Sequence, residues 1–258
     1  MVLSFKSNPE GEKKAGPTVE KRRSPRYDLG ENFPFKTKLI LFQNGGVKTT
    51  DAKGKEWSAT LIDLSATGAN LHLSLAAVAF QREACRLKIT RGDYLLEIPA
   101  TIAHFRCHSQ YSQCGLSFNF PNLESQQAYL QLLEPIVIGN SLIPIEAVQD
   151  TPGRHREQFG NGTSTALSVW RSAPGGEITG FDLRMNRYVV RWNEGAPELE
   201  VAGLGEIDPS KPNPPVPVLV PLTEAQHEDF RWIFCLAVPN LSPSVPVDVR
   251  KFLASLVA

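Results

Sequence analysis

A polar hexad, Asp63–Gly68, separates two stretches whose patterns are typical of β-strands. Trp57–Ile62 before it is rich in strand-forming residues, and Ala69–Leu73 after it alternates apolar with polar side chains. The hexad therefore predicts a sharp turn between two strands, with polar side chains leaving one face. Asp and Ser also bond their own backbone in turns without any ligand, so the hexad taken alone favours an ordinary turn over a binding site.

Three residues of the hexad have the chemistry to bind a purine. The carboxylate of Asp63 can accept hydrogen bonds from the adjacent N–H donors of a guanine edge, and the hydroxyl of Ser65 can both donate and accept. Gly68 would either take a positive φ or allow a ligand to approach closely. The hexad is therefore a candidate binding site in a turn.

A basic run, Lys21–Tyr27, lies upstream of the hexad. It places Arg22 and Arg26 four residues apart around Pro25, whose fixed φ favours a stiff, extended connector. Guanidinium groups held in this way pair with phosphates and stack on bases. The alternative is a solvated basic run or a targeting patch.

Taken together, Arg22-x-x-x-Arg26 followed by Asp63-x-Ser65-x-x-Gly68 resembles the PilZ domain, the bacterial receptor module for cyclic di-GMP. Every defining position of both motifs is filled. The resemblance implies that the two motifs lie close together and enclose the dinucleotide. It implies that the two arginines hold phosphates and stack on guanines, that the Asp and Ser contact guanine edges, and that the glycine makes room.

The resemblance covers about residues 20–133, and Cys114–Phe118 is similar to the strand that ends the family's barrel. Arg23 and Asn70 are further candidates for ligand contact. The remainder of the chain resembles no family that we recognise. The resemblance thus assigns a ligand to the first half only.

The first half also shows the pattern of a small antiparallel barrel, with about six short strands and regular turns. Asn44-Gly45-Gly46 and Arg91-Gly92-Asp93 are predicted turns. Asn122 is expected to cap a helix that Pro135 stops and that covers one end of the barrel. The other predicted strands are Lys36–Phe42, Val47–Thr50, Cys85–Thr90, Tyr94–Ile98 with its continuation Ala100–Phe105, and Gln113–Phe120.

The fold class expected is mainly β, with a small α+β domain in the second half. We predict a disordered tail over residues 1–19, a PilZ-like domain over 20–148 and an α+β output or interaction domain over 149–258. After the first helix we predict a short apolar segment at Ile136–Ile145, a linker at Gln149–Thr163, and strands at Ala166–Trp170, Ile178–Arg184 and Tyr188–Trp192. A proline-rich connector is predicted at Pro209–Pro221. One helix is predicted to start at the Thr223 capping box and to end before Pro239, and a last helix is predicted over Asp248–Val257.

The net charge, the apolar runs and the cysteine spacing of the chain bear on its partners and its location. The chain of 258 residues carries 27 basic and 27 acidic side chains, so no overall field attracts it to nucleic acid. No apolar run reaches the ~18 residues needed to span a bilayer, and the four cysteines show no paired spacing. We expect a cytoplasmic protein with reduced thiols, no membrane contact and no nucleic-acid partner.

Two further kinds of site receive little support. His104, Cys107, His108 and Cys114 lack the ligand spacing of a zinc site, and strand alternation would send the first two to opposite faces. The chain contains no Gly-x-Ser-x-Gly, His-Glu-x-x-His or Walker motif. We therefore expect no enzyme, no catalytic residue, no metal and no cofactor.

The function expected is that of a cytosolic cyclic di-GMP effector, with Arg22, Arg26, Asp63, Ser65 and Gly68 as the ligand-binding residues. It would relay nucleotide binding to an unidentified protein partner through the C-terminal domain. One alternative is a PilZ-like interaction module that binds protein and no nucleotide. Another is an enzyme whose site lies in the C-terminal domain.

Overall fold

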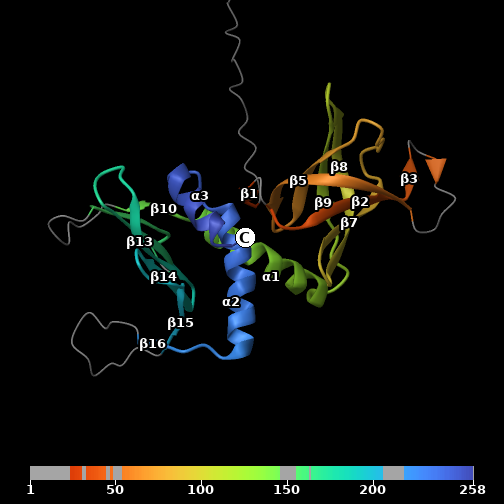
Figure 1. Cartoon of the computed structure of the whole chain (residues 1–258). Helices are drawn as coiled ribbons and strands as arrows, with labels where there is room; N and C mark the ends of the chain where they lie inside the picture. Colours follow the sequence, from red (N-terminus) through yellow and green to blue (C-terminus); the bar gives the residue numbers. More distant parts are fainter. Residues whose placement is uncertain are drawn as a thin grey trace, which may run out of the picture.

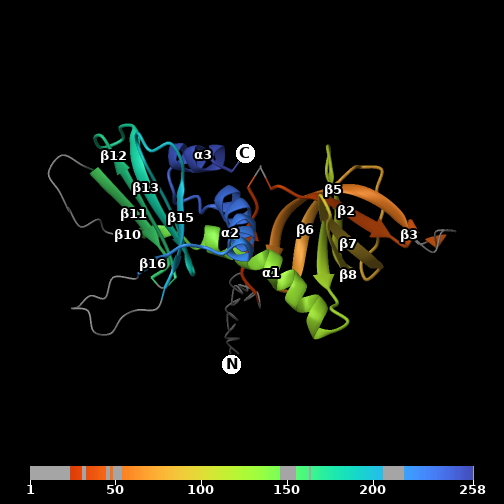
Figure 2. The same cartoon turned by 60° about the horizontal axis from the view of Figure 1, so that its bottom comes forward.

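The structure, a computed structural model, describes residues 24–30, 33–44, 47–48, 54–145, 155–162, 164–205 and 218–257. Two antiparallel sheets stand at opposite ends of the molecule, with helices between them (Figures 1 and 2). Several predicted features lie outside the described residues: the tail over 1–19, Arg22, Arg23, the glycines of the Asn44-Gly45-Gly46 turn and most of the proline-rich connector.

The first sheet closes into the predicted six-stranded antiparallel barrel. The barrel strands run in the order β5-β2-β7-β8-β9-β6, and β6 pairs back onto β5. β1 adds to the edge of β5 beyond the end of β2, and β3 and β4 form a separate hairpin. The bounds are β1 (Arg26–Asp28), β2 (Lys36–Leu41), β3 (Gln43–Asn44), β4 (Val47–Lys48), β5 (Lys55–Ser65), β6 (Gly68–Leu73), β7 (Ala84–Arg91), β8 (Tyr94–Cys107) and β9 (Ser112–Phe118).

The turn around the hexad is shorter than predicted. β5 continues through Ser65 and β6 begins at Gly68, so only Ala66 and Thr67 form the turn. The strand extends this far because Ser65 pairs with Gly68 on one side and with Arg26 of β1 on the other. The polar residues Asp63 and Ser65 therefore lie in a strand, where their neighbour Leu64 points into the core and is fully buried.

Helix α1 (Leu123–Asn140) follows the barrel, and Asn122 caps it as predicted, accepting a hydrogen bond from the amide of Ser125 at 2.8 Å. The prediction that Pro135 stops this helix is wrong. A proline lacks the N–H that would bond the carbonyl four residues earlier, that of Gln131. The indole N–H of Trp232 donates to this carbonyl at 3.4 Å, so the missing partner is supplied from outside the helix.

The second sheet is a meander whose strands β10 to β16 pair in chain order. The predicted linker at Gln149–Thr163 is wrong for His155–Gly160, which form β11. The sequence of this strand is polar, which is why it was predicted as a linker. Arg156 and Gln158 face outward and donate to the hydroxyl of Ser168 on the next strand. The bounds are β10 (Ile143–Ile145), β11 (His155–Gly160), β12 (Thr165–Arg171), β13 (Ile178–Met185), β14 (Tyr188–Asn193), β15 (Glu200–Leu204) and β16 (Leu219–Val220).

Three helical segments complete the α+β half: α2 (Glu224–Ala237), the 3-10 turn η1 (Val238–Asn240) and α3 (Val247–Ser255). The predicted capping box is present, since Thr223 accepts from the amide of Gln226 and the Gln226 side chain accepts from the amide of Thr223 at 2.9 Å. Pro239 lies in η1, immediately after α2. None of the helices that the structure describes has the length and apolarity required to span a membrane.

Helices α1 and α2 pack together between the sheets, and each serves two hydrophobic cores (Figure 1). Ile136 of α1 and Leu236 of α2 belong to the barrel core, and both are fully buried. Ile138 of α1 and Phe234 of α2 belong to the core beneath the second sheet. The C-terminal part of the chain therefore completes the core of the barrel, and the second sheet begins at Ile143, before the predicted boundary at residue 149.

Candidate functional site

Strand β1 brings the upstream basic motif onto the hexad. Arg26 lies opposite Ser65, and Asp28 lies opposite Asp63, in the β1–β5 ladder. From this position Nη1 of Arg26 donates to Oδ1 of Asp63 at 2.9 Å. The guanidinium side chain is 34% exposed and the carboxylate side chain 11% exposed, so the ion pair lies at the surface with its acidic partner beneath. The structure thus joins one residue from each predicted motif.

Asp63 is also held from the opposite side. Its Oδ2 accepts a hydrogen bond from Nδ2 of Asn70 at 3.2 Å, and Oδ1 of Asn70 accepts from Nε2 of Gln113 at 3.2 Å. Asn70 was a further candidate in the sequence, whereas Gln113 was not identified. No local sequence pattern identifies Gln113, because this residue lies on β9 and joins the network only through the pairing of β6 with β9.

Ser65 makes the bonds of an ordinary turn residue. Its hydroxyl donates to the carbonyl of Gly68 at 3.2 Å and accepts from the amide of Thr67 at 3.4 Å. Its own carbonyl accepts from the hydroxyl of Tyr129 at 2.6 Å, so α1 packs directly against the turn. Burial and the negative charge of Asp63 raise the pKa of Tyr129, which stays protonated and able to donate.

Gly68 has a structural reason of its own. It is not among the described residues with a positive φ. A Cβ built at this position would fall on the carbonyl oxygen of Leu116 in β9, a backbone atom that cannot rotate away. Glycine is therefore required at position 68 because strand β9 of the barrel lies close to it.

We expect Gly68→Ala to destabilise the free protein. The added methyl group would force β6 and β9 apart, and such overpacking costs about 1–3 kcal/mol of unfolding free energy. Chemical denaturation without nucleotide measures this. The control is Ala66→Gly, which changes the turn next to Gly68 without adding a methyl group against β9. A Gly68→Ala protein as stable as the parent would show that β9 yields to the methyl group.

The four residues considered for a metal site do not converge. Cys114 is fully buried in the barrel, whereas Cys107 and His108 are exposed. Within the described residues, no group of three or more His, Cys, Asp or Glu side chains is placed to hold a metal ion. His104 is opposite Gly115 in the β8–β9 ladder, and its ring lies over that glycine.

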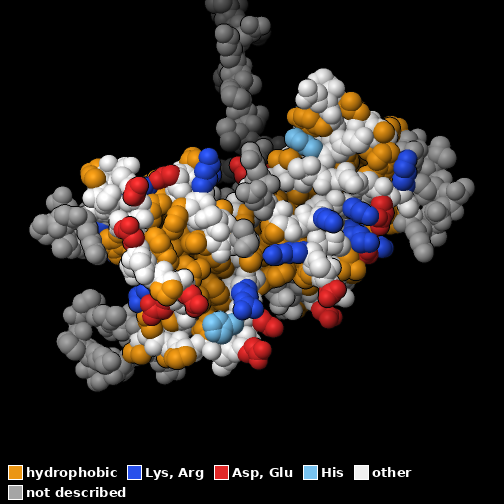
Figure 3. All heavy atoms as spheres, viewed as in Figure 1, with side chains coloured by type: hydrophobic (Ala, Val, Ile, Leu, Met, Phe, Trp, Pro, Cys, Tyr) orange, Lys and Arg blue, Asp and Glu red, His pale blue; other side chains and the backbone are white. Residues whose placement is uncertain are grey.

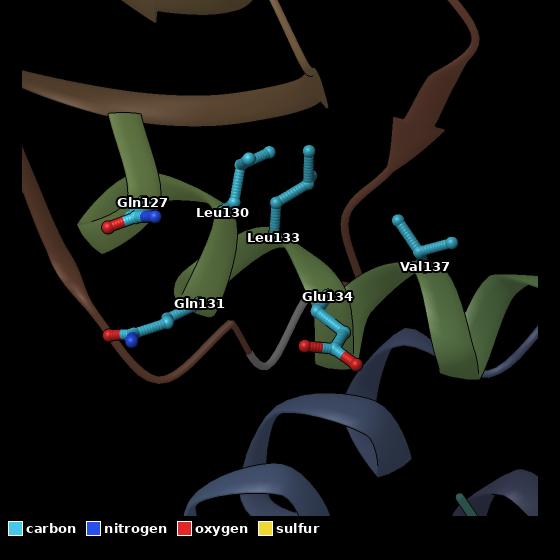
Figure 4. A pocket seen from close by; sticks show the side chains of 6 residues that line it. All are labelled: Gln127, Leu130, Gln131, Leu133, Glu134 and Val137. Carbon is cyan, nitrogen blue, oxygen red and sulfur yellow. The ribbon is translucent and has the colours of Figure 1, made fainter. Parts of the chain in front are cut away.

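A hollow of about 610 Å³ lies along α1 (Figure 4). Leu130, Leu133 and Val137 point to one side of it, and its one described charged residue is Glu134, which accepts a hydrogen bond from Asn186 at 3.1 Å. No basic side chain is among its described lining residues, so it does not suit an anionic ligand. On the face shown in Figure 3, basic and acidic side chains are interspersed rather than gathered into one patch.

Comparison with known families assigns the barrel. Residues 20–134 match the PilZ domain. This range contains both motifs, all the barrel strands and the first part of α1. Residues 20–134 form a PilZ domain. The remaining part of the chain has no family assignment, and no curated protein matches the sequence.

Several solved structures are similar to this chain at low identity. The PilZ domain with c-di-GMP of YcgR from Escherichia coli is 14% identical, with a TM-score of 0.32, and the match covers 42% of this chain and 86% of that chain. The Klebsiella pneumoniae MrkH–c-di-GMP complex is 16% identical, with a TM-score of 0.38 and coverage of 46% and 54%. The Borreliella burgdorferi PlzA protein in complex with c-di-GMP is 10% identical, with a TM-score of 0.26 and coverage of 72% and 84%.

Proposed function

We propose that this chain is a cytoplasmic receptor that binds cyclic di-GMP through its PilZ domain. The observation that carries the proposal is the ion pair between Arg26 and Asp63, residues 37 positions apart that belong to the two ligand motifs of the family. A guanidinium and a carboxylate side by side offer donors for a phosphate and acceptors for a guanine edge. Arg22, which lies outside the described residues, is proposed as the second phosphate ligand.

The remaining motif residues complete the proposed site. Asp63 would accept from a guanine edge, and Ser65 would contribute its hydroxyl once the turn adjusts. Gly68 lets this turn lie close to β9. Because it has no side chain, it would also leave room for the ligand. Asn70 is proposed as a secondary contact, because it already bonds the carboxylate of Asp63.

Isothermal titration of the full chain with cyclic di-GMP tests the proposal. We expect saturable binding that weakens as the salt concentration rises, because phosphate pairing is electrostatic and is screened by salt. GMP, which lacks the second base and the ring, is the matched control ligand and should bind much more weakly. Absence of heat and of any thermal stabilisation with cyclic di-GMP would instead favour the interaction module that binds protein and no nucleotide.

The alternative of an enzyme in the second half finds no support in the described pocket there. This pocket of about 450 Å³ is lined by Arg156, Ser168, Trp170, Phe181, Asp182, Arg191 and Asn193. It contains one carboxylate and no histidine, and that carboxylate is engaged with Arg191 at 2.6 Å. General acid and base catalysis needs a group that is free to exchange protons. We propose no reaction for this chain.

We further propose that nucleotide binding is relayed to the second half and from there to a protein partner. The residues that follow Arg26 dock on the C-terminal half: the amide of Gly30 donates to Oδ1 of Asn240 at 2.9 Å. Nδ2 of Asn140, at the end of α1, donates to the carbonyls of both Asp28 and Asn240, at 3.4 and 3.0 Å. A ligand that repositions β1 would therefore change contacts made by η1.

Hydrogen exchange with and without cyclic di-GMP tests the relay. We expect the nucleotide to alter protection at Gly30 and in η1 of the parent. In Asn240→Ala, which removes the acceptor for the Gly30 amide but keeps the backbone carbonyl that Asn140 bonds, the change in η1 should diminish while binding persists. Ser242→Ala, a neighbour that makes no described contact with β1, is the control. An unchanged response in Asn240→Ala would contradict this route.

A further inference from the structure

One row of residues crosses four adjacent strands of the barrel at the level of the ion pair. Asp63 on β5 is opposite Asn70 on β6, Asn70 is opposite Gly115 on β9, and Gly115 is opposite His104 on β8. Residues opposite one another on neighbouring strands share a face of the sheet. This face is the outer one, because the neighbours of the row, including Leu64, Leu71 and Cys114, are fully buried in the core.

Both ends of the row follow an irregularity in the ladder. The register shifts between Leu61 and Asp63 on β5, and between Ile102 and His104 on β8. An irregularity of this kind re-aims the next side chain and is over-represented beside functional sites. Here each shift directly precedes the polar side chain that ends the row.

The imidazole of His104 covers the place that a side chain at residue 115 would occupy. A Cβ built on Gly115 would meet the ring atoms Cε1, Nδ1 and Nε2 of His104. A glycine in a strand weakens it and often marks the close approach of another group. In this barrel the approaching group is the histidine ring, which lies over β9 and extends the outer surface that begins at Asp63 and Asn70.

The charges around His104 favour a neutral ring. Burial lowers its pKa, as do the positive charges of Arg106 on the same strand and of Arg26 on β1, whereas the negative charge of Asp63 acts in the opposite direction. A neutral, planar ring that is partly buried on one side can accept a base on the other side at little desolvation cost.

We infer that His104 is a further ligand-contacting residue, whose ring is the surface on which one purine of the bound nucleotide stacks. This inference rests on the proposed function. The ring lies on the same outer face as the Arg26–Asp63 ion pair, separated from Asn70 only by a glycine. His104 belongs to neither of the two sequence motifs, so it adds a contact from β8 to those from β1, β5 and β6.

Titration of cyclic di-GMP into full-length variants tests the inference. His104→Ala should weaken binding by about tenfold, the scale of one base stacked on an aromatic side chain. His104→Phe keeps a planar ring and should stay within about threefold of the parent, because stacking requires the plane and not the nitrogens. His227→Ala, on α2, is the matched control and should bind like the parent.

Each outcome has a separate meaning. If the parent binds and His104→Ala binds equally tightly, His104 is no contact; if His104→Phe loses as much as His104→Ala, the ring does not act by stacking. If the parent itself takes up no cyclic di-GMP, the proposed function fails first and the inference falls with it. A readout independent of any variant is the Cε1–H signal of His104 in the parent, which a stacked purine should shift through its ring current. An unshifted signal at saturation would overturn the inference.

Discussion

Arg26→Ala is expected to lose most of its affinity for cyclic di-GMP. The substitution removes a guanidinium that would pair with a phosphate, and truncating one partner of such a charge pair costs about 2–5 kcal/mol. It also leaves Asp63 held only by Asn70 among its described partners, so a carboxylate faces the anionic ligand without its neutralising arginine. Isothermal titration at one fixed salt concentration measures the change.

The control for this substitution is Arg86→Ala. Arg86 is also an exposed arginine of the PilZ domain that pairs with a carboxylate, Glu97, at 3.0 Å. It lies on β7, which pairs with β2 and β8 and not with β5. Removing it should leave affinity within about twofold, since an exposed pair of this kind contributes little. If Arg26→Ala binds the nucleotide as tightly as the parent, the proposed site is wrong.

Leu236→Ala should destabilise the barrel although residue 236 lies far outside the PilZ match. Leu236 is fully buried among the side chains of the barrel core. Truncation of a buried leucine removes its packing and leaves a cavity, with a cost of about 2–5 kcal/mol of unfolding free energy. Chemical denaturation gives the total, and hydrogen exchange in β7 and β8 shows whether the barrel itself is affected.

Leu130→Ala is the matched control on α1, because Leu130 is 39% exposed. This change should alter the free energy of unfolding by less than about 0.5 kcal/mol, as surface substitutions usually do. Unchanged protection of β7 and β8 in Leu236→Ala would show that the barrel does not depend on the packing of this side chain.

The sequence predicted what depends on local pattern. Alternating residues and turn chemistry between residues 36 and 118 identified the barrel strands, and the side chains of Asn122 and Thr223 identified two helix starts, because a cap is satisfied within one turn of its helix. The motif residues were recognised for the same reason: each half of the motif is short.

Features that depend on distant partners required the tertiary structure. Pro135 continues α1 because Trp232, 97 residues later, donates to the carbonyl that the proline leaves unbonded. The strand at His155–Gly160 is polar on one face because Ser168 on the next strand accepts its side-chain donors.

The candidate site divides in the same way. Its residue types are local, but the 2.9 Å contact between Arg26 and Asp63, and the approach of His104 through the gap at Gly115, exist only because strand pairing brings distant segments together. A sequence carries the chemistry of each side chain. The register of the closed barrel decides which of these side chains meet, because a shift of one residue would turn each of them to the opposite face.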